Sequence, residues 1–105
     1  MKDFTPETRS LIDALKAAGF TIVKADNGQD VVYATEGIDL IVATLNSVDE
    51  SHLYIQTCDG QMLWLYLVYG NNPGELVCDY VLNPELDKVV EAHAAQWAGR
   101  PQPMK

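Results

Sequence analysis

The chain of 105 residues has 48% hydrophobic side chains and a formal net charge of −8 at pH 7, which predicts a folded acidic domain rather than a disordered segment. Positions 25–87 contain eleven carboxylates and no lysine or arginine. Such a block repels phosphate, so we exclude direct nucleic-acid binding and expect a basic protein partner.

Targeting segments and disulfides are not expected. The two cysteines, Cys58 and Cys78, are too few for a disulfide framework, and the N-terminus lacks the apolar core of a secretion signal. The longest apolar run, residues 62–69, is far shorter than the ~20 residues that a membrane helix needs. We therefore expect a cytoplasmic protein that does not contact a membrane. Both cysteines are expected in the core, where unpaired cysteines usually lie.

Two helices are expected, one near each end of the chain. The first begins at Pro6, which suits the first helical position, and stops at Gly19. Asn83 caps the second helix, which begins at Pro84 and runs as far as Gly99. Because His93 lies on the apolar stripe of this second helix, we expect it to be packed and hydrogen-bonded rather than a metal ligand.

Between the helices the apolar period changes to two, which predicts short strands. Strands at residues 20–25 and 31–34 flank an Asp-Asn-Gly sequence at residues 26–28 that is typical of a type I′ hairpin turn. A third strand is expected at residues 39–46. It precedes a polar turn at residues 47–51.

A second hairpin follows, with strands at residues 52–58 and 61–69 joined about Asp59 and Gly60. A turn cluster then begins at residue 70, where Pro73 and Gly74 suit the centre of a type II turn. Residues 76–82 fit either a sixth strand or a short helix.

The loop of this second hairpin decides which side chains share a face. A two-residue loop would place Ile55 opposite Trp64 and mix polar with aliphatic residues on both faces. A three-residue loop with Gly60 in the left-handed conformation shifts the pairing by one residue. We expect this second register because it sorts the side chains cleanly. One face then carries Leu53, Ile55, Thr57, Leu63, Leu65 and Leu67, and the other carries His52, Tyr54, Gln56, Met62, Trp64 and Tyr66.

The expected fold is α+β: an antiparallel β-meander of four to six strands flanked by an N-terminal and a C-terminal helix. Residues 1–99 are expected to form a single domain. Residues 100–105, which include two prolines, are expected to form a mobile tail.

No motif in the chain predicts catalysis. Cys78, Asp79 and His93 supply the residue types of a thiol nucleophile and its base, but no cysteine-protease sequence surrounds either thiol, and the acidic neighbourhood opposes thiolate formation. Histidines and cysteines lack metal-ligand spacing, and no glycine-rich phosphate loop is present. We expect a protein that is not an enzyme and that needs no cofactor or metal.

One face of the second hairpin is aromatic and is the strongest candidate for an interface. It carries the interface candidates Tyr54, Met62, Trp64 and Tyr66. If both helices cover the other side of the sheet, this patch faces solvent and marks a contact surface. If one helix packs on each face, the same residues are ordinary core. The sequence leaves both placements open.

The segment WLYLVYGNNPGELVCDY at residues 64–80 resembles part of small uncharacterised proteins carried by bacteriophages and prophages. The resemblance covers about a sixth of the chain. It implies a bacterial or phage origin and transfers no functional residue.

These observations favour a non-enzymatic acidic binding protein that engages a basic partner protein, one form of which would be a phage-type inhibitor that mimics nucleic acid. The alternative is a homo-oligomeric accessory protein, such as a homodimer, that uses the aromatic face as its contact. The acidic surface candidates are Asp26, Asp30, Glu36, Asp49, Glu50 and Asp59.

Overall fold

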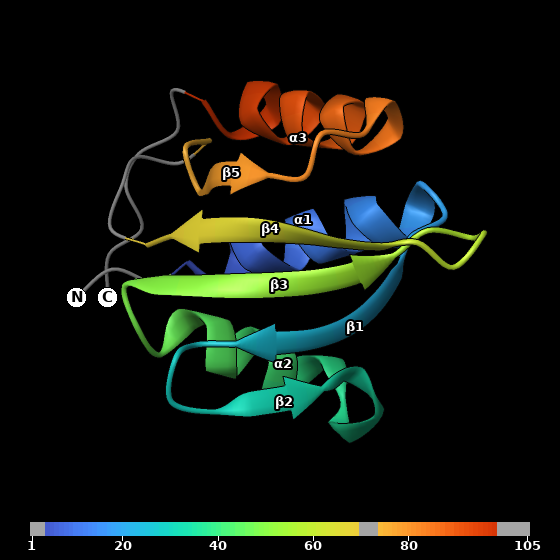
Figure 1. Cartoon of the computed structure of the whole chain (residues 1–105). Coiled ribbons are helices and arrows are strands. Elements are labelled where there is room, and N and C mark those ends of the chain that lie inside the picture. The colour runs from blue at the N-terminus through green and yellow to red at the C-terminus, as the bar shows by residue number, and fades with distance from the viewer. Residues whose placement is uncertain (1–3, 70–73, 99–105) are drawn as a thin grey trace.

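The computed structural model describes residues 4–69 and 74–98. Most of the predicted turn after residue 69, including Pro73, and the predicted tail at residues 100–105 lie outside the described residues. The elements in chain order are α1 (Thr5–Ala17), β1 (Thr21–Asp26), β2 (Val31–Tyr33), the 3-10 helix η1 (Ala34–Glu36), α2 (Ile38–Asn46), β3 (Glu50–Gln56), β4 (Met62–Val68), β5 (Val77–Tyr80) and α3 (Pro84–Trp97) (Figure 1).

The strands form one antiparallel sheet in the order β2-β1-β3-β4-β5. Figure 1 shows α1 and α2 behind this sheet and α3 beside β5, and α1 contacts both other helices. The predicted α+β class, with an antiparallel sheet and a helix near each end, is confirmed. The ambiguous residues 76–82 contain the strand β5.

The prediction of a strand at residues 39–46 is wrong, because these residues belong to the helix α2. The apolar residues Ile38, Ile41, Val42 and Leu45 recur at helical spacing, and the last three are buried. The helix carries the chain from β2 across β1 to β3, so β1 lies between β2 and β3 in the sheet. The strand order therefore departs from chain order at this edge.

The first hairpin is present, but its turn is not type I′. That turn requires a positive φ at both central residues, and none of the described residues other than glycine has one. Asp26 pairs with Val31, which leaves a four-residue loop. Within it the side-chain oxygen of Asn27 accepts hydrogen bonds from the backbone N–H groups of Gln29 and Asp30, at 2.9 and 2.7 Å.

The amide nitrogen of Asn27 reaches from this loop to the end of α2. It donates hydrogen bonds to the Thr44 carbonyl at 3.3 Å and to the Ser47 hydroxyl at 2.9 Å. A buried asparagine with all these partners holds the hairpin loop against the helix. Asn27 therefore stabilises the loop through contacts with the end of α2, and not as part of the type I′ turn that the sequence predicted.

The predicted register of the second hairpin is confirmed. Ile55 lies opposite Leu63, and Tyr54 lies opposite Trp64. Gly60 has a φ of +94°, and the backbone N–H of Thr57 donates to the Gln61 carbonyl at 2.9 Å, as a three-residue loop requires. The leucine-rich side of this hairpin therefore faces the helices.

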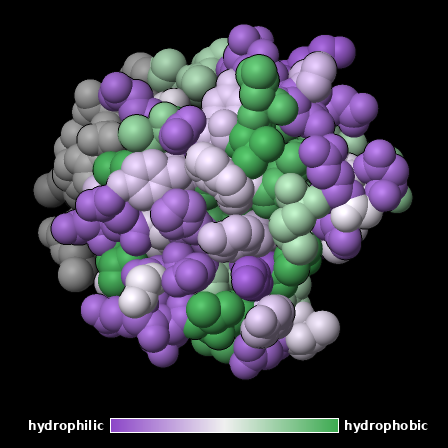
Figure 2. All heavy atoms as spheres, in the orientation of Figure 1, coloured by the Kyte–Doolittle hydropathy of each residue, from purple (hydrophilic) through white to green (hydrophobic). Residues whose placement is uncertain are grey.

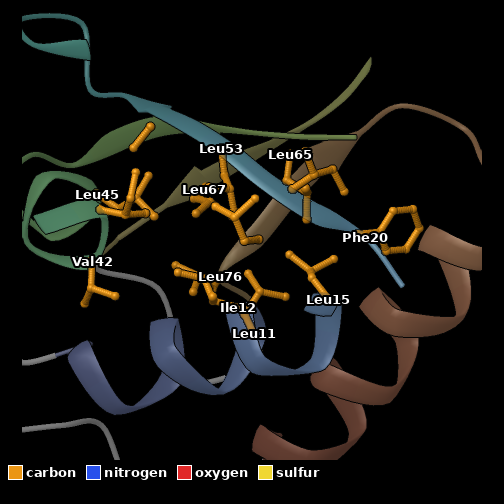
Figure 3. Close-up of a cluster of buried hydrophobic side chains, with 14 of the residues drawn as sticks. Leu11, Ile12, Leu15, Phe20, Val42, Leu45, Leu53, Leu65, Leu67 and Leu76 are labelled. Atoms are coloured by element: carbon orange, nitrogen blue, oxygen red, sulfur yellow. The ribbon is translucent and has the colours of Figure 1, made fainter. Parts of the chain in front are cut away.

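The core lies between that side of the sheet and the helices, as Figure 3 shows. On α1, Leu11, Ile12 and Leu15 are fully buried, and they face fully buried leucines of β3 and β4. On α3, the Asn83 side chain accepts hydrogen bonds from the backbone N–H groups of Glu85 and Leu86, which confirms the predicted cap.

The prediction that both cysteines lie in the core is wrong. Cys58 lies in the exposed β3–β4 loop and Cys78 is exposed on the edge strand β5.

Candidate functional site: the open face of the sheet

The helices leave one face of the sheet uncovered, and we call it the open face. Burial alternates strictly along β3 and β4, with every second side chain fully buried or nearly so and the others partly exposed. The predicted interface residues Tyr54, Met62, Trp64 and Tyr66 all belong to the exposed set. Among the two placements that the sequence left open, the structure has the one in which this face is not core.

Strand pairing arranges the open face in two rows. One row runs Tyr33, Lys24, Tyr54 and Trp64 across β2, β1, β3 and β4. The other row runs Asp26, His52, Tyr66 and Asp79 across β1, β3, β4 and β5. In Figure 2, which views this face, side chains of intermediate hydropathy lie over the middle of the sheet, and both hydrophilic and hydrophobic ones lie around them.

The centre of the open face is a cluster of four rings: His52, Tyr54, Trp64 and Tyr66. The His52 ring lies 5.0 Å from Tyr66, 6.0 Å from Trp64 and 6.3 Å from Tyr54, measured between ring centroids. His52 was not among the predicted interface residues, although the expected register already placed it on this face. We call these four residues the aromatic cluster.

Carboxylates border the aromatic cluster. The Tyr66 hydroxyl donates a hydrogen bond to Glu50, and this bond raises the pKa of Tyr66 above the ordinary value of 10.0. Asp79 lies directly opposite Tyr66, and Asp26 lies directly opposite His52. Within residues 4–69 and 74–98, none of these three carboxylates is in an ion pair. The cluster therefore has negative charge on several sides that no ion pair among the described residues neutralises.

The predicted acidic surface residues separate into two groups. Asp26, Asp30, Asp49 and Glu50 gather at one end of the sheet, where β1 ends and β3 begins. Glu36 lies in η1 beyond the end of β2, and Asp59 lies in the β3–β4 loop, both toward the other end. Asp59 accepts a hydrogen bond from the Thr57 hydroxyl, which lowers its pKa from the ordinary 3.8. The six residues do not form one continuous row.

The Cys, Asp and His combination considered for catalysis is dispersed. Cys78 and Asp79 are exposed on β5, whereas His93 is buried on α3 and pairs with Glu7 of α1. The packed, hydrogen-bonded role predicted for His93 is confirmed. Its partner was missed, because an acidic residue in a first helical turn is usually exposed.

Other features of the described residues give little indication of a function. A cavity of about 300 Å³ lies between the end of α1, the β3–β4 loop and the start of α3, and its lining includes Cys58, Asp59 and Glu85 but no histidine or lysine. No group of three metal-binding side chains occurs in the part of the chain that the structure describes. No helix there is long and apolar enough to cross a lipid bilayer.

Comparisons with protein-family models, with curated proteins and with solved structures found no match.

Proposed function

We propose that the protein is a non-catalytic binding protein whose open face engages a basic segment of a partner protein. The observation that carries this proposal is the uncovered aromatic cluster, bordered by Asp26, Glu50 and Asp79. A single lysine, Lys24, lies in the two rows of this face. Rings and carboxylates together favour a cationic ligand.

The physical basis is twofold. Aromatic faces attract cations through their ring quadrupoles, and exposed aromatic side chains are enriched at protein interfaces. Carboxylates beside the rings add a longer-ranged attraction that steers a basic partner and speeds its association. Both terms act at the same place on this surface.

A nucleic-acid mimic of the phage-inhibitor type is one specific form of such a protein. It would use carboxylates at both ends of the sheet in place of phosphates. We favour binding at the aromatic cluster over such a mimic, because four of the six acidic candidates gather at one end of the sheet, close to His52. Two exposed cysteines without a disulfide suit a reducing compartment, so we place the binding in the cytoplasm.

The direct test is a titration with a short peptide of lysine and arginine, followed by the two tryptophan indole N–H signals in a nitrogen-15 NMR spectrum. Trp64 lies in the aromatic cluster, whereas the Trp97 indole donates to Ser10 between α1 and α3, at 3.1 Å. We expect the Trp64 signal to move with peptide and the Trp97 signal to stay. Movement of both or of neither would contradict the proposed site.

Charge reversal separates a local site from a general charge effect. Glu50→Lys and Asp59→Lys change the net charge equally, but only Glu50 touches the aromatic cluster. We expect Glu50→Lys to weaken peptide binding at least about fivefold and Asp59→Lys less than about twofold at moderate salt, where the Debye length is about 10 Å. Equal losses would favour the mimic form instead.

Self-association is the competing use of the same surface. If the open face joins two copies, light scattering will show a dimer, and the peptide will compete with that dimer rather than bind a monomer. A stable dimer that excludes the peptide would overturn the proposal in favour of the homo-oligomeric protein.

A further inference from the structure

The open face already holds one cation of its own. The ammonium nitrogen of Lys24 lies 4.9 Å from the centre of the Tyr54 ring and 5.9 Å from that of Tyr33. Lys24 is directly opposite both tyrosines in the sheet, and it forms no ion pair with another described residue. The Tyr33 and Tyr54 half of the face is therefore occupied by the chain's own side chain.

The other half has rings and carboxylates but, among residues 4–69 and 74–98, no lysine or arginine on the strands that carry it, β3, β4 and β5. The His52 and Tyr66 rings are tilted by 30° to one another, and Trp64 stands edge-on to His52 at 68°. Glu50 accepts a hydrogen bond from the Tyr66 hydroxyl, and Asp79 lies directly opposite Tyr66 on β5. A ligand bound at Tyr66 would therefore have aromatic rings and carboxylates as its neighbours.

This geometry suits a flat cation with several N–H groups. A guanidinium group stacks on an aromatic ring and donates hydrogen bonds in its own plane to neighbouring carboxylates. An ammonium group is a strongly hydrated point charge, so it is less suited both to stacking on a ring and to donating hydrogen bonds in one plane. We infer that the His52, Trp64 and Tyr66 half of the open face is an arginine-selective subsite, and that Lys24 excludes a second cation from the other half. This inference rests on the proposed function and names the chemistry of its ligand.

Matched peptides test the selectivity. The probes are a hexapeptide of alternating arginine and glycine, its lysine counterpart, and its citrulline counterpart, which is planar but uncharged. We expect the arginine peptide to bind about three- to tenfold more tightly than the lysine peptide, and the citrulline peptide to bind at least about tenfold more weakly than the arginine peptide.

Two tyrosine variants locate the subsite. Tyr66→Leu removes a ring from the proposed subsite, and Tyr33→Leu removes a ring from the half that Lys24 occupies. We expect Tyr66→Leu to bring the ratio of arginine to lysine affinity close to one and Tyr33→Leu to leave it unchanged. Because a ratio is measured, a general loss of stability does not imitate this result. An unchanged ratio in Tyr66→Leu would overturn the assignment.

Lys24→Gln tests the second part of the inference. Removing a like charge at this range should raise the affinity for the arginine peptide about two- to threefold. Unchanged or weaker binding would overturn the role of Lys24.

The outcomes separate this inference from the function on which it rests. Equal binding of arginine and lysine peptides, lost in Glu50→Lys, would overturn the selectivity and leave the basic-partner function standing. Citrulline binding as tight as arginine binding, or no binding of any peptide, would overturn both.

Discussion

The His93 imidazole on α3 lies 2.8 Å from the Glu7 carboxylate on α1, and both side chains are at least 97% buried. The same carboxylate oxygen accepts a hydrogen bond from the backbone N–H of Gly74, at 3.1 Å. His93 also stacks on Trp97, whose indole bonds to Ser10. A few polar groups thus join the N-terminal helix, the C-terminal helix and the chain that enters β5.

The buried pair should be strongly coupled. Glu7→Leu and His93→Leu each leave one polar partner buried without the other, and we expect each to lower the free energy of unfolding by about 3 kcal/mol or more. The double variant buries no orphaned group from this pair, so its loss should be clearly smaller than the sum of the two. Urea unfolding followed by circular dichroism measures all three.

Glu7→Gln is the control for this comparison of the two single variants with the double variant. It keeps an oxygen that can accept from Gly74 and His93, so it should lose less stability than Glu7→Leu. Strictly additive single losses in the double variant would show that the two side chains stabilise the fold independently.

Neighbouring positions on β4 should respond oppositely to a charge. Trp64 is partly exposed on the open face, and Leu65 is fully buried on the core face. We expect Trp64→Glu to stay folded with a loss of about 1–2 kcal/mol, and Leu65→Glu to unfold the domain. Circular dichroism distinguishes the two outcomes. An unfolded Trp64→Glu would mean that the open face is structurally required, and light scattering on the folded variant reports any loss of self-association.

Two glycines with similar backbone conformations should tolerate a methyl group differently. Gly19 has a φ of +97° and Gly74 a φ of +93°, so alanine is strained at both. An added Cβ at Gly19 meets no atom within 4 Å, whereas at Gly74 it would lie 2.9 Å from the Ala94 carbonyl oxygen and the Ala98 backbone nitrogen. We expect Gly19→Ala to lower stability by about 1 kcal/mol and Gly74→Ala by markedly more. Thermal unfolding gives the comparison, and equal shifts in the midpoint would contradict close packing of Gly74 on α3.

Burial of Tyr69 should make the fold sensitive to alkali. Burial raises the pKa of Tyr69 well above its usual value of 10.0, and its hydroxyl lies 3.1 Å from the Thr8 hydroxyl. Below about pH 10 the tyrosine is protonated in both states. Above that pH the unfolded chain loses the proton first, so stability should fall by up to about 1.4 kcal/mol per pH unit from this group.

Tyr69→Phe removes the group that titrates. It should lose about 1 kcal/mol at neutral pH with the hydrogen bond, but its stability should decline less steeply above about pH 10. Tyr66→Phe, which alters an exposed hydroxyl, should keep most of the decline. Parallel pH profiles for Tyr69→Phe and the unmodified chain would contradict this account.

Parts of the fold followed from short-range sequence patterns. Alternation in β3 and β4, combined with a glycine suited to the left-handed conformation at position 60, was enough to predict the register and both faces. Asn83 and Pro84 were enough to predict where α3 begins. In each case the deciding contacts lie within a few residues of the pattern.

Residues 38–46 show why the rest could not be predicted in this way. This largely apolar segment, with its β-branched residues, fits a strand, yet its apolar positions also fit a helix, and packing against β1 and β3 decides in favour of the helix. Glu7 is a second case. Its burial depends on His93, which lies 86 positions later in the chain. The open face needed the same kind of information, because its exposure depends on where the helices pack.

The two shortest strands form the edges of the sheet: β2 has three residues and β5 has four, whereas the strands between them have six or seven. Short edges present few free backbone groups, so they offer little template for a strand from another chain. We therefore expect the protein to resist aggregation by edge-to-edge pairing even where acid neutralises its charge, and thioflavin fluorescence during prolonged incubation at low pH would expose a failure of that protection. A partner peptide with N-methylated backbone amides should accordingly bind as well as the unmodified one.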